Sequence, residues 1–366
     1  MSATWGRKFK ITIFGESHGS HIGIVLDGVP SGTKIDMDSI IEEMDRRAPG
    51  RNDISTARRE SDSPEIISGI FEGRATGAPL TMIIKNKDHR SNDYSQVRDI
   101  MRPGHADYSS REKYKGFNDY RGSGHFSGRI TAPLVFVGAI AKQILEEKDI
   151  YISSHIASVK NIKDEKFSEE TLNKEVFKRL KKESLPLLNK SKREIIHRKI
   201  IEAKEEGDSL GGTVECSVVG LKAGVGDPFF ESIESVISSL MFSIPAVKGI
   251  EFGSGFDMSK MLGSQANDEF YYDLDDKVRT RTNHNGGING GISNGMPIVF
   301  TLAIKAPSSI SKKQRSINLK TKSNQDFELK GRHDPIIIPR VIPVVEACAA
   351  ISILDCLLVD GSEIKW

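Results

Sequence analysis

The chain has 366 residues, of which 37% are hydrophobic and 28% are charged, as is typical of a folded globular protein rather than a disordered or fibrous one. The 52 Lys and Arg residues nearly balance the 50 Asp and Glu residues, and the net charge of +2 argues against a nucleic-acid-binding protein. The 3 cysteines show no CxxC spacing, no zinc-site spacing is present, and the N-terminus lacks the layout of a signal peptide, so we expect a cytoplasmic protein without disulfides or a metal.

Runs of apolar and β-branched residues, separated by turns rich in Gly and Pro, predict strands in the N-terminal part of the chain. These strands are expected at residues 10–14, 22–26, 65–71 and 80–84. A helix is expected at residues 38–47, because Asp36 can cap its start and Pro49 and Gly50 follow its end.

Two long apolar stretches predict buried helices. The first lies within residues 131–147, where Pro133 falls in the first turn and its missing N–H does no harm. Lys142 interrupts this stretch, and Glu346 and Asp355 interrupt the second one at residues 341–359. Because charges break both stretches, we expect core helices rather than membrane spans.

The segment from about residue 160 to residue 206 is rich in lysine and glutamate. It has helical periodicity at Leu172, Val176 and Leu180 and again across residues 195–201. Acids are interleaved with the bases, so we interpret this segment as a peripheral helical insert with solvated faces, not as a nucleic-acid surface.

The remaining elements alternate between strand and helix. Strands are expected at 213–219, 247–252 and 297–305, helices at 232–242 and 344–358, and a polar loop or hairpin at 312–329. No linker clearly divides the chain, so we predict a single α/β or α+β domain over residues 1–366.

Several segments combine glycine, histidine and arginine without apolar periodicity. They are residues 14–19, 102–108, 120–129, 282–295 and 330–335. Glycines let backbone amides approach a phosphate or a flat ring closely. The glycines of 122–128 miss the spacing of the dinucleotide-binding fingerprint, so this stretch alone is equally consistent with a tight turn.

The histidines and arginines of these segments indicate one shared site. His18, His105, His125 and His333 all lie in polar loops, where a histidine titrates near neutral pH and can act as a general acid or base. Arginines recur beside them, at positions 46, 47, 51, 102, 121, 129, 332 and 340. Guanidinium groups suit bidentate pairing with carboxylate or phosphate, so we predict a site for a small polyanion that also holds several proton donors.

The same segments closely resemble the signature segments of the chorismate synthase family. The resemblance rests on residues 15–19, 27–32, 102–107, 283–288 and 331–335 and runs in order along nearly the whole chain. It implies the family's fold, a single-domain α+β protein built as a β-α-β sandwich and usually assembled as a homotetramer. It also implies anti-1,4-elimination of phosphate from 5-enolpyruvylshikimate-3-phosphate, a reaction that needs reduced FMN although it involves no net redox change.

The resemblance further implies roles for individual residues. His18 would protonate or stabilise the reduced flavin, His105 would act as a general acid toward the leaving phosphate, and Asp334 would help to relay the ring proton. The substrate anions would be held by Ser17, Arg47, Arg102, Arg129 and Arg340. FMN would be bound by His125, Phe126, Ser127, Pro245, Ala246, Gly290, Lys305, Ala306, Pro307, Ser308, Ser309 and Arg332.

Two positions depart from the family pattern. His125 stands where many members have an arginine, and Asp53 stands where a basic residue is often linked to reduced pyridine nucleotide. Arg47 matches another NADPH-associated position, so the sequence leaves open whether NADPH serves as reductant or a separate flavin reductase supplies the electrons. The residues also leave two other functions to weigh: an NADPH-dependent oxidoreductase that uses residues 122–128 as a phosphate loop, and a non-catalytic protein that binds flavin or a phosphoryl ligand.

Overall fold

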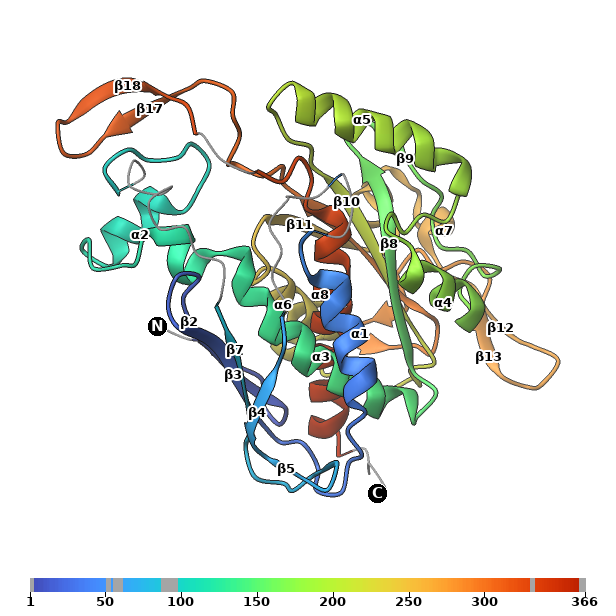
Figure 1. Cartoon of the computed structure of the whole chain (residues 1–366). Helices are drawn as coiled ribbons and strands as arrows, with labels where there is room; N and C mark the ends of the chain where they lie inside the picture. Colours follow the sequence, from blue (N-terminus) through green and yellow to red (C-terminus); the bar gives the residue numbers. More distant parts are fainter. Residues whose placement is uncertain (1–2, 51–53, 55–61, 87–97, 330–332, 362–366) are drawn as a thin grey trace.

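The computed structural model describes residues 3–50, 54, 62–86, 98–329 and 333–361, which form an α+β protein with two five-stranded sheets (Figure 1). The first sheet has the order β1 (Thr4–Trp5), β2 (Lys10–Gly15), β3 (His21–Asp27), β7 (Leu80–Lys85) and β4 (Glu65–Ser68). The second has the order β11 (Val247–Phe252), β16 (Ile298–Ile304), β10 (Gly212–Val219), β8 (Tyr151–Val159) and β9 (Ile162–Lys163). Neighbouring strands are antiparallel in both sheets.

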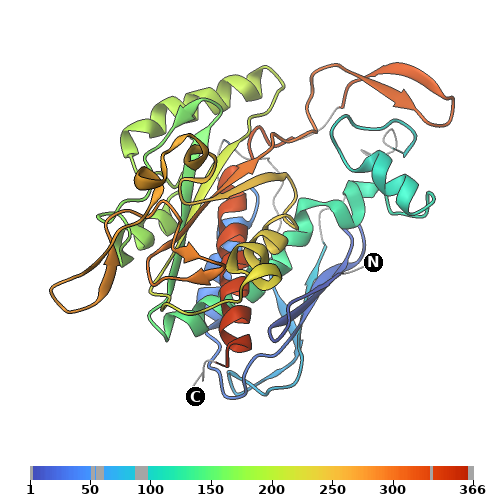
Figure 2. The same cartoon turned by 180° about the vertical axis from the view of Figure 1, so that it is seen from behind.

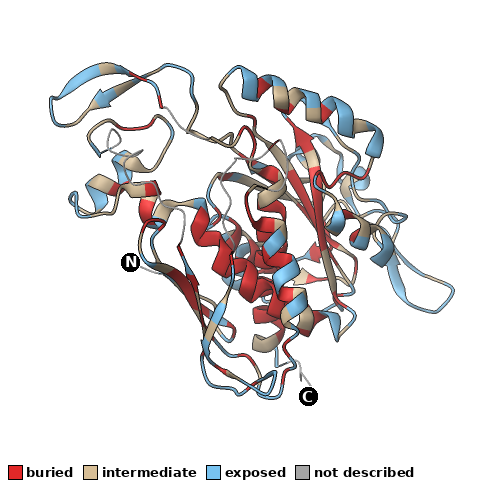
Figure 3. Cartoon of the chain, in the orientation of Figure 1, coloured by how far each residue is buried: buried red, intermediate tan, exposed pale blue. Residues whose placement is uncertain are grey.

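Helices lie between the two sheets. The long helices are α3 (Ala132–Glu146) and α8 (Ile338–Val359), accompanied by α1 (Met37–Arg47) and α6 (Ile233–Met241). Helix α3 packs on β3, β7 and α8, and α8 packs on β8 and β10, so these two helices join the sheets through one hydrophobic core (Figure 3). The helices cross closely where Gly138 faces Ala347, since a Cβ at residue 138 would lie only 2.2 Å from the Ala347 Cβ.

The predicted helices of this layer are confirmed, except that α8 begins at Ile338 rather than at residue 344 and contains Pro343, and their charges have specific partners. The Asp36 side chain accepts hydrogen bonds from the amides of residues 38 and 39 and so caps α1. Two helical segments are long and apolar enough to cross a membrane: α3 together with the segment before it, and α8. However, 89% of the most apolar stretch of the first and 94% of that of the second are buried inside the protein. Lys142 of α3 forms ion pairs with Glu43 and Glu346 at 3.2 and 2.7 Å, which accounts for a lysine at a buried position.

Other predictions need correction. The predicted strand 65–71 is broken at Gly69, which has a φ of 91°, and β5 (Ile70–Phe71) pairs instead with β6 (Arg74–Ala75). The nine-residue strand β8 was not predicted, because its central residues Ser153, Ser154 and His155 are polar. All three are buried, and His155 lies 2.9 Å from Glu215 and 3.3 Å from Asp164.

The predicted helical insert contains α4 (Lys174–Lys182) and α5 (Arg193–Glu205). Most of its charged residues are at least partly exposed, but the Asp164 side chain is buried beside His155, and Leu180 and Ile196 are fully buried. The inward side of the insert therefore contributes to the hydrophobic interior, and Figure 1 shows α5 lying along the outer end of β8 and β9.

The segment 312–329 forms a hairpin rather than a loop, with β17 (Gln314–Asn318) paired to β18 (Ser323–Phe327). It projects from one end of the molecule together with α2 (Asp107–Lys113), as Figures 1 and 2 show. The Met101 amide donates to the carbonyl of Ile317 at 3.3 Å, which fixes the hairpin to the loop before α2. The other short elements are α7 (Gly263–Ala266), β12 (Phe270–Tyr272), β13 (Val278–Thr280), β14 (Ile288–Asn289) and β15 (Ile292–Ser293).

Candidate active site

The predicted arginines converge where α1 ends and α3 and α8 begin. Arg47, the last residue of α1, and Arg129, in the 3₁₀ turn before α3, both pair with the carboxylate of Asp62, Arg47 at 2.8 Å. Arg47 also donates to the Gly128 carbonyl at 2.9 Å and to the Thr131 hydroxyl at 3.3 Å. The three charged side chains are almost completely buried, so each depends on the others to remain charged there.

Arg340, in the first turn of α8, joins the same cluster. Its Nε donates to the Arg47 carbonyl at 3.2 Å and its Nη1 donates to Asp334 at 2.8 Å. Burial, together with the charges of Arg340 and Arg129, lowers the pKa of Arg47 to about 10 against the opposing effect of Asp62. The cluster thus holds three arginines against two carboxylates, Asp62 and Asp334, and the excess positive charge favours an incoming anion.

The Ser17–His18 turn lies beside this cluster, and both residues are buried. The Ser17 amide donates to the Gly124 carbonyl at 3.1 Å, and the His18 ring packs on Gly122. A Cβ at residue 122 would lie 2.3 Å from His18 Cδ2, and the φ of 54° there also favours glycine. The Ser17 hydroxyl is buried and has no hydrogen-bond partner among the described residues, which is consistent with a ligand at this place.

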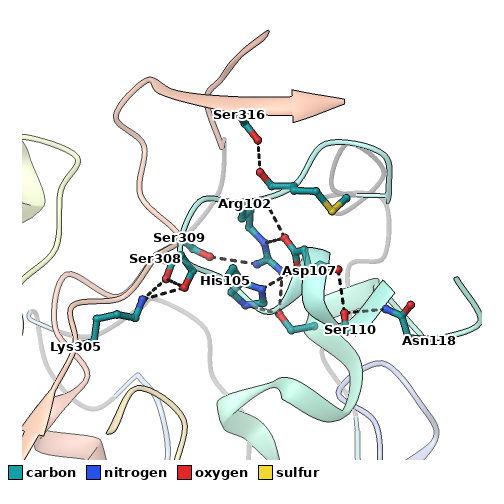
Figure 4. Close-up of polar contacts among 12 residues, drawn as sticks. Arg102, His105, Asp107, Ser110, Asn118, Lys305, Ser308, Ser309 and Ser316 are labelled. Atoms are coloured by element: carbon teal, nitrogen blue, oxygen red, sulfur yellow. Dashed lines mark hydrogen bonds and ion pairs between the residues drawn. The ribbon is translucent and has the colours of Figure 1, made fainter. Parts of the chain in front are cut away.

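A second group gathers around Asp107 at the start of α2 (Figure 4). Asp107 accepts two hydrogen bonds of 2.7 Å from the Arg102 guanidinium, and its Oδ1 lies 2.7 Å from His105 Nδ1. Burial raises the pKa of Asp107, but its hydrogen bonds with Arg102 and His105 hold that pKa well below the usual range. Asp107 therefore stays ionised at neutral pH and orients both side chains.

Ser123 faces this group from the glycine-rich turn before α3. Its hydroxyl lies 3.2 Å from His105 Nε2 and accepts a hydrogen bond of 3.0 Å from Arg102. Because Ser123 follows Gly122, which packs on His18, the same turn contacts both groups. A cavity of about 210 Å³ opens beside His105 and Asp107 and is also lined by Phe126.

The segment after β16 brings a lysine and two serines to the second group. Lys305 Nζ donates to the Gly104 carbonyl at 3.1 Å and to the Ser308 hydroxyl, and Ser309 accepts from Arg102 at 3.2 Å. Burial, and next the charge of Lys248, lower the pKa of Lys305. A phosphate group at this place would find a cation and two hydroxyl groups close together, so this donor set fits the phosphate of a flavin mononucleotide.

The other predicted cofactor residues are more scattered. His125 Nδ1 lies 2.9 Å from the Gly15 carbonyl, and the Ser127 hydroxyl accepts from the Arg129 amide at 3.3 Å. Phe126 packs beside the Tyr114 ring at 6.1 Å.

Pro245 and Ala246 follow the end of α6, and the Ala246 carbonyl accepts from the Lys305 amide at 2.8 Å. Ala306 and Pro307, which follow Lys305 in the chain, are half-buried, and the Pro307 carbonyl accepts a hydrogen bond from the Ser209 hydroxyl at 2.7 Å.

Gly290 lies apart from these residues. It occupies the turn between β14 and β15. In the same turn, the Gly291 carbonyl accepts a hydrogen bond from the amide of Ile233, the first residue of α6. Because α6 has nine residues, its two ends are about 14 Å apart, and Gly290 and Pro245 lie at opposite ends. Arg51, Asp53 and Arg332 lie outside the described residues.

The structure adds polar residues for which the sequence reasoning gave no role. Asp62, Asp107 and Ser123 each touch two predicted site residues, and Asn86 touches Arg129 and the turn that contains Ser17 and His18. Asp107 and Ser123 lie inside the segments that combine glycine with histidine and arginine, which is the only signal that could have singled them out. Asp62 and Asn86 lie outside these segments, and only the fold brings them to the site.

Fold and site together define a protein with a buried, positively charged site suited to a small polyanion. The arginine clusters can hold anionic groups, and His105, His18 and Asp334 lie beside them. The glycine-rich turn at 122–124 is filled by His18 and Asp119 rather than open to a nucleotide, because added Cβ atoms there would lie 2.3 Å from His18 and 2.2 Å from the Asp119 carbonyl oxygen. This argues against the oxidoreductase alternative.

Comparison with known proteins identifies the family. The family model described as chorismate synthase matches residues 9–358. A chorismate synthase of Methanocaldococcus jannaschii is 45% identical over 98% of this chain and 97% of its own length, and one of Dehalococcoides mccartyi is 44% identical over 99% and 98%. A crystal structure of chorismate synthase superposes with a TM-score of 0.74 at 29% identity and covers 98% of this chain and 94% of its own.

The chain belongs to the chorismate synthase family. It is a carbon–oxygen lyase that eliminates phosphate from 5-enolpyruvylshikimate-3-phosphate to form chorismate, a step of the shikimate pathway toward the aromatic amino acids. The family's reaction requires a reduced flavin.

Proposed function

We propose that this chain binds reduced FMN and the substrate together between its two polar clusters, with Arg47, Arg129, Arg340 and Arg102 holding the substrate's phosphate and carboxylates. The observation that carries this proposal is the convergence of three arginines on Asp62 and Asp334 beside the buried Ser17–His18 turn. Each desolvated, charged hydrogen bond to the substrate would contribute about 1.5–3 kcal/mol.

We assign the leaving-group proton to His105. Asp107 lies 2.7 Å from its Nδ1, which orients the imidazole and leaves Nε2 toward Ser123 and the site. From Nε2 the proton passes to the oxygen of the departing phosphate. A positioned general acid of this kind is worth about 10²–10⁴ in rate.

We assign the removal of the ring proton to a relay that includes Asp334. Arg340 pairs with Asp334 at 2.8 Å and so holds the carboxylate at a fixed place at the start of α8. His18, buried against Gly122, supplies or holds a proton at its imidazole beside the flavin position. Bound reduced FMN would supply electron density to the substrate as the phosphate leaves.

The FMN phosphate fits best at Lys305, Ser308 and Ser309, with His125, Phe126 and Ser127 nearby, and we retain Pro245, Ala246, Ala306, Pro307, Gly290 and Arg332 as proposed contacts of the cofactor. NADPH beside Arg47, or a separate flavin reductase, remains our proposal for the source of electrons.

We further propose that the whole chain is one domain, the family's β-α-β sandwich, in a cytoplasmic homotetramer. Large apolar side chains exposed on the surface support association: Phe229 is 85%, Phe230 91%, Phe256 80% and Leu262 69% exposed. Covering such side chains would remove apolar surface from water, which is the main driving force of subunit association.

The residue roles are tested by comparing two variants in FMN binding and in turnover. His105→Ala is expected to bind FMN as the native protein does and to lose about 10²–10⁴ in kcat. Lys305→Ala is expected to bind FMN more weakly. Unchanged turnover of His105→Ala would contradict the role of His105, and unchanged FMN binding by Lys305→Ala would remove the proposed phosphate contact.

A further inference from the structure

Asn86 lies directly after β7 at a place where two parts of the site meet, and it is 5% exposed. Its side-chain oxygen accepts a hydrogen bond of 2.9 Å from Arg129 Nε. Its side-chain nitrogen donates to the carbonyls of Glu16 at 3.0 Å and Gly19 at 2.9 Å. All hydrogens of the amide group and its oxygen are therefore engaged.

The partners fix the orientation of this amide. Arginine Nε is only a donor and backbone carbonyls are only acceptors, so the oxygen must face Arg129 and the nitrogen must face the turn. A carboxylate at residue 86 would keep the contact with Arg129 but would oppose two carbonyl oxygens. An apolar side chain would leave the buried Arg129 Nε and two partly buried carbonyls without their partner.

The two carbonyls belong to the residues that bracket Ser17 and His18. The backbone N–H of Asn86 also donates to the Ser20 carbonyl at 3.1 Å, so residue 86 supports the turn along its length. On its other side, Arg129 shares Asp62 with Arg47. One side chain thus joins the arginine cluster to the turn that bears His18.

We propose that Asn86 is a positioning residue that couples the substrate-binding arginines to the Ser17–His18 turn. This inference rests on the proposed roles of Arg129 and His18. An anion that draws Arg129 into place also fixes, through Asn86, the turn that orients the imidazole of His18. Loss of the amide leaves both groups present but no longer held relative to each other.

A double-mutant cycle tests the coupling by measuring kcat and KM anaerobically with reduced FMN. Asn86→Ala in the otherwise native chain is expected to lower kcat by about 10- to 100-fold. In a chain that already carries His18→Ala, the same change is expected to lower kcat by less than about threefold, because the residue through which it acts is gone. A purely structural role would produce equal losses in both chains and would overturn the proposal.

Controls separate this proposal from the proposed function. Asn189→Ala also removes an amide with three hydrogen bonds, but in the helical insert, and should leave kcat unchanged. If His18→Ala and Arg129→Ala leave kcat and KM unchanged, the proposed roles have failed rather than the coupling. If Asn86→Ala melts below the assay temperature, Asn86→Ser, which keeps a small polar group, replaces it in the cycle. The same pattern of losses in kcat is expected, and equal losses in both chains would again overturn the proposal.

Discussion

Asp62 is the carboxylate on which the arginine cluster depends, and Asp62→Asn tests this directly. The native carboxylate gives one oxygen to Arg47 and the other to Arg129, and all three side chains are at most 4% exposed. An asparagine keeps the shape of the side chain but removes the charge and turns a hydrogen-bond donor toward one of the guanidinium groups.

The expected loss of stability is large. Removing one partner of a buried ion pair destabilises a protein by about 3–5 kcal/mol, because the remaining charge stays buried. We expect the lower end, about 3 kcal/mol, because Arg47 keeps Gly128 and Thr131 and Arg129 keeps Asn86. At about 2 °C per kcal/mol for a large domain, the melting temperature should fall by about 6 °C.

The assay compares thermal unfolding of ligand-free native protein, Asp62→Asn and Asp99→Asn. Asp99 pairs with Arg111 at 3.7 Å and both side chains are 35% exposed, so its replacement should change stability by less than about 0.5 kcal/mol. Saturating inorganic phosphate should raise the melting temperature of Asp62→Asn more than that of the native protein, because an anion replaces the missing charge. Melting of Asp62→Asn within about 1 °C of the native protein would refute the reasoning.

The pH dependence gives a further check on Asp62. Burial raises its pKa, but Arg47 and Arg129 lower it more, so the pKa of the folded protein lies below the ordinary value. Its stabilisation is therefore full above the ordinary pKa of aspartate and declines as the pH falls through the folded pKa. The difference in melting temperature between native protein and Asp62→Asn should narrow in acid.

The remaining predictions concern single positions. Gly122→Ala should greatly lower turnover, because the new Cβ would lie 2.3 Å from the His18 ring. The control Gly73→Ala has a similar positive φ but open space around its Cβ. It should leave turnover unchanged and lower the free energy of unfolding by about 1 kcal/mol in thermal unfolding. Glu346→Gln should lower the unfolding free energy by about 3 kcal/mol in urea titrations, since it removes one of the two buried carboxylates that pair with Arg46 and Lys142 and leaves them only Glu43. Burial lowers the pKa of His155, but the flanking carboxylates raise this pKa above the ordinary value. The stabilisation that His155 provides should therefore be full below about pH 6 and decline as the pH rises. Urea unfolding of native protein and His155→Gln at several pH values would show this decline.

The sequence predicted most of the regular elements because their apolar residues repeat with the period of the element they form. Strand β8 escaped prediction because Ser154 and His155 are polar yet fully buried, and only the pairing of His155 with Glu215 and Asp164 makes that burial tolerable. A partner distant in the sequence cannot be read from local periodicity.

For the site as well, the sequence singled out some residues and missed others. Arginines and histidines in glycine-rich loops have no core to pack against, so Arg102, His105 and Arg129 could be recognised as chemistry rather than structure. Asp62 and Asn86 could not, since each gains its role only from side chains brought to it by the fold. A single carboxylate or amide beside a strand carries no such signal in the sequence.

The central claim is the reaction itself, and an anaerobic assay tests it most directly. Purified protein is mixed with 5-enolpyruvylshikimate-3-phosphate and dithionite-reduced FMN, and phosphate release and chorismate absorbance are followed together. A parallel reaction with NADPH in place of dithionite shows whether the protein reduces flavin itself. The account predicts equal yields of phosphate and chorismate that appear only with reduced flavin. Absence of both products from folded protein that binds FMN would contradict it.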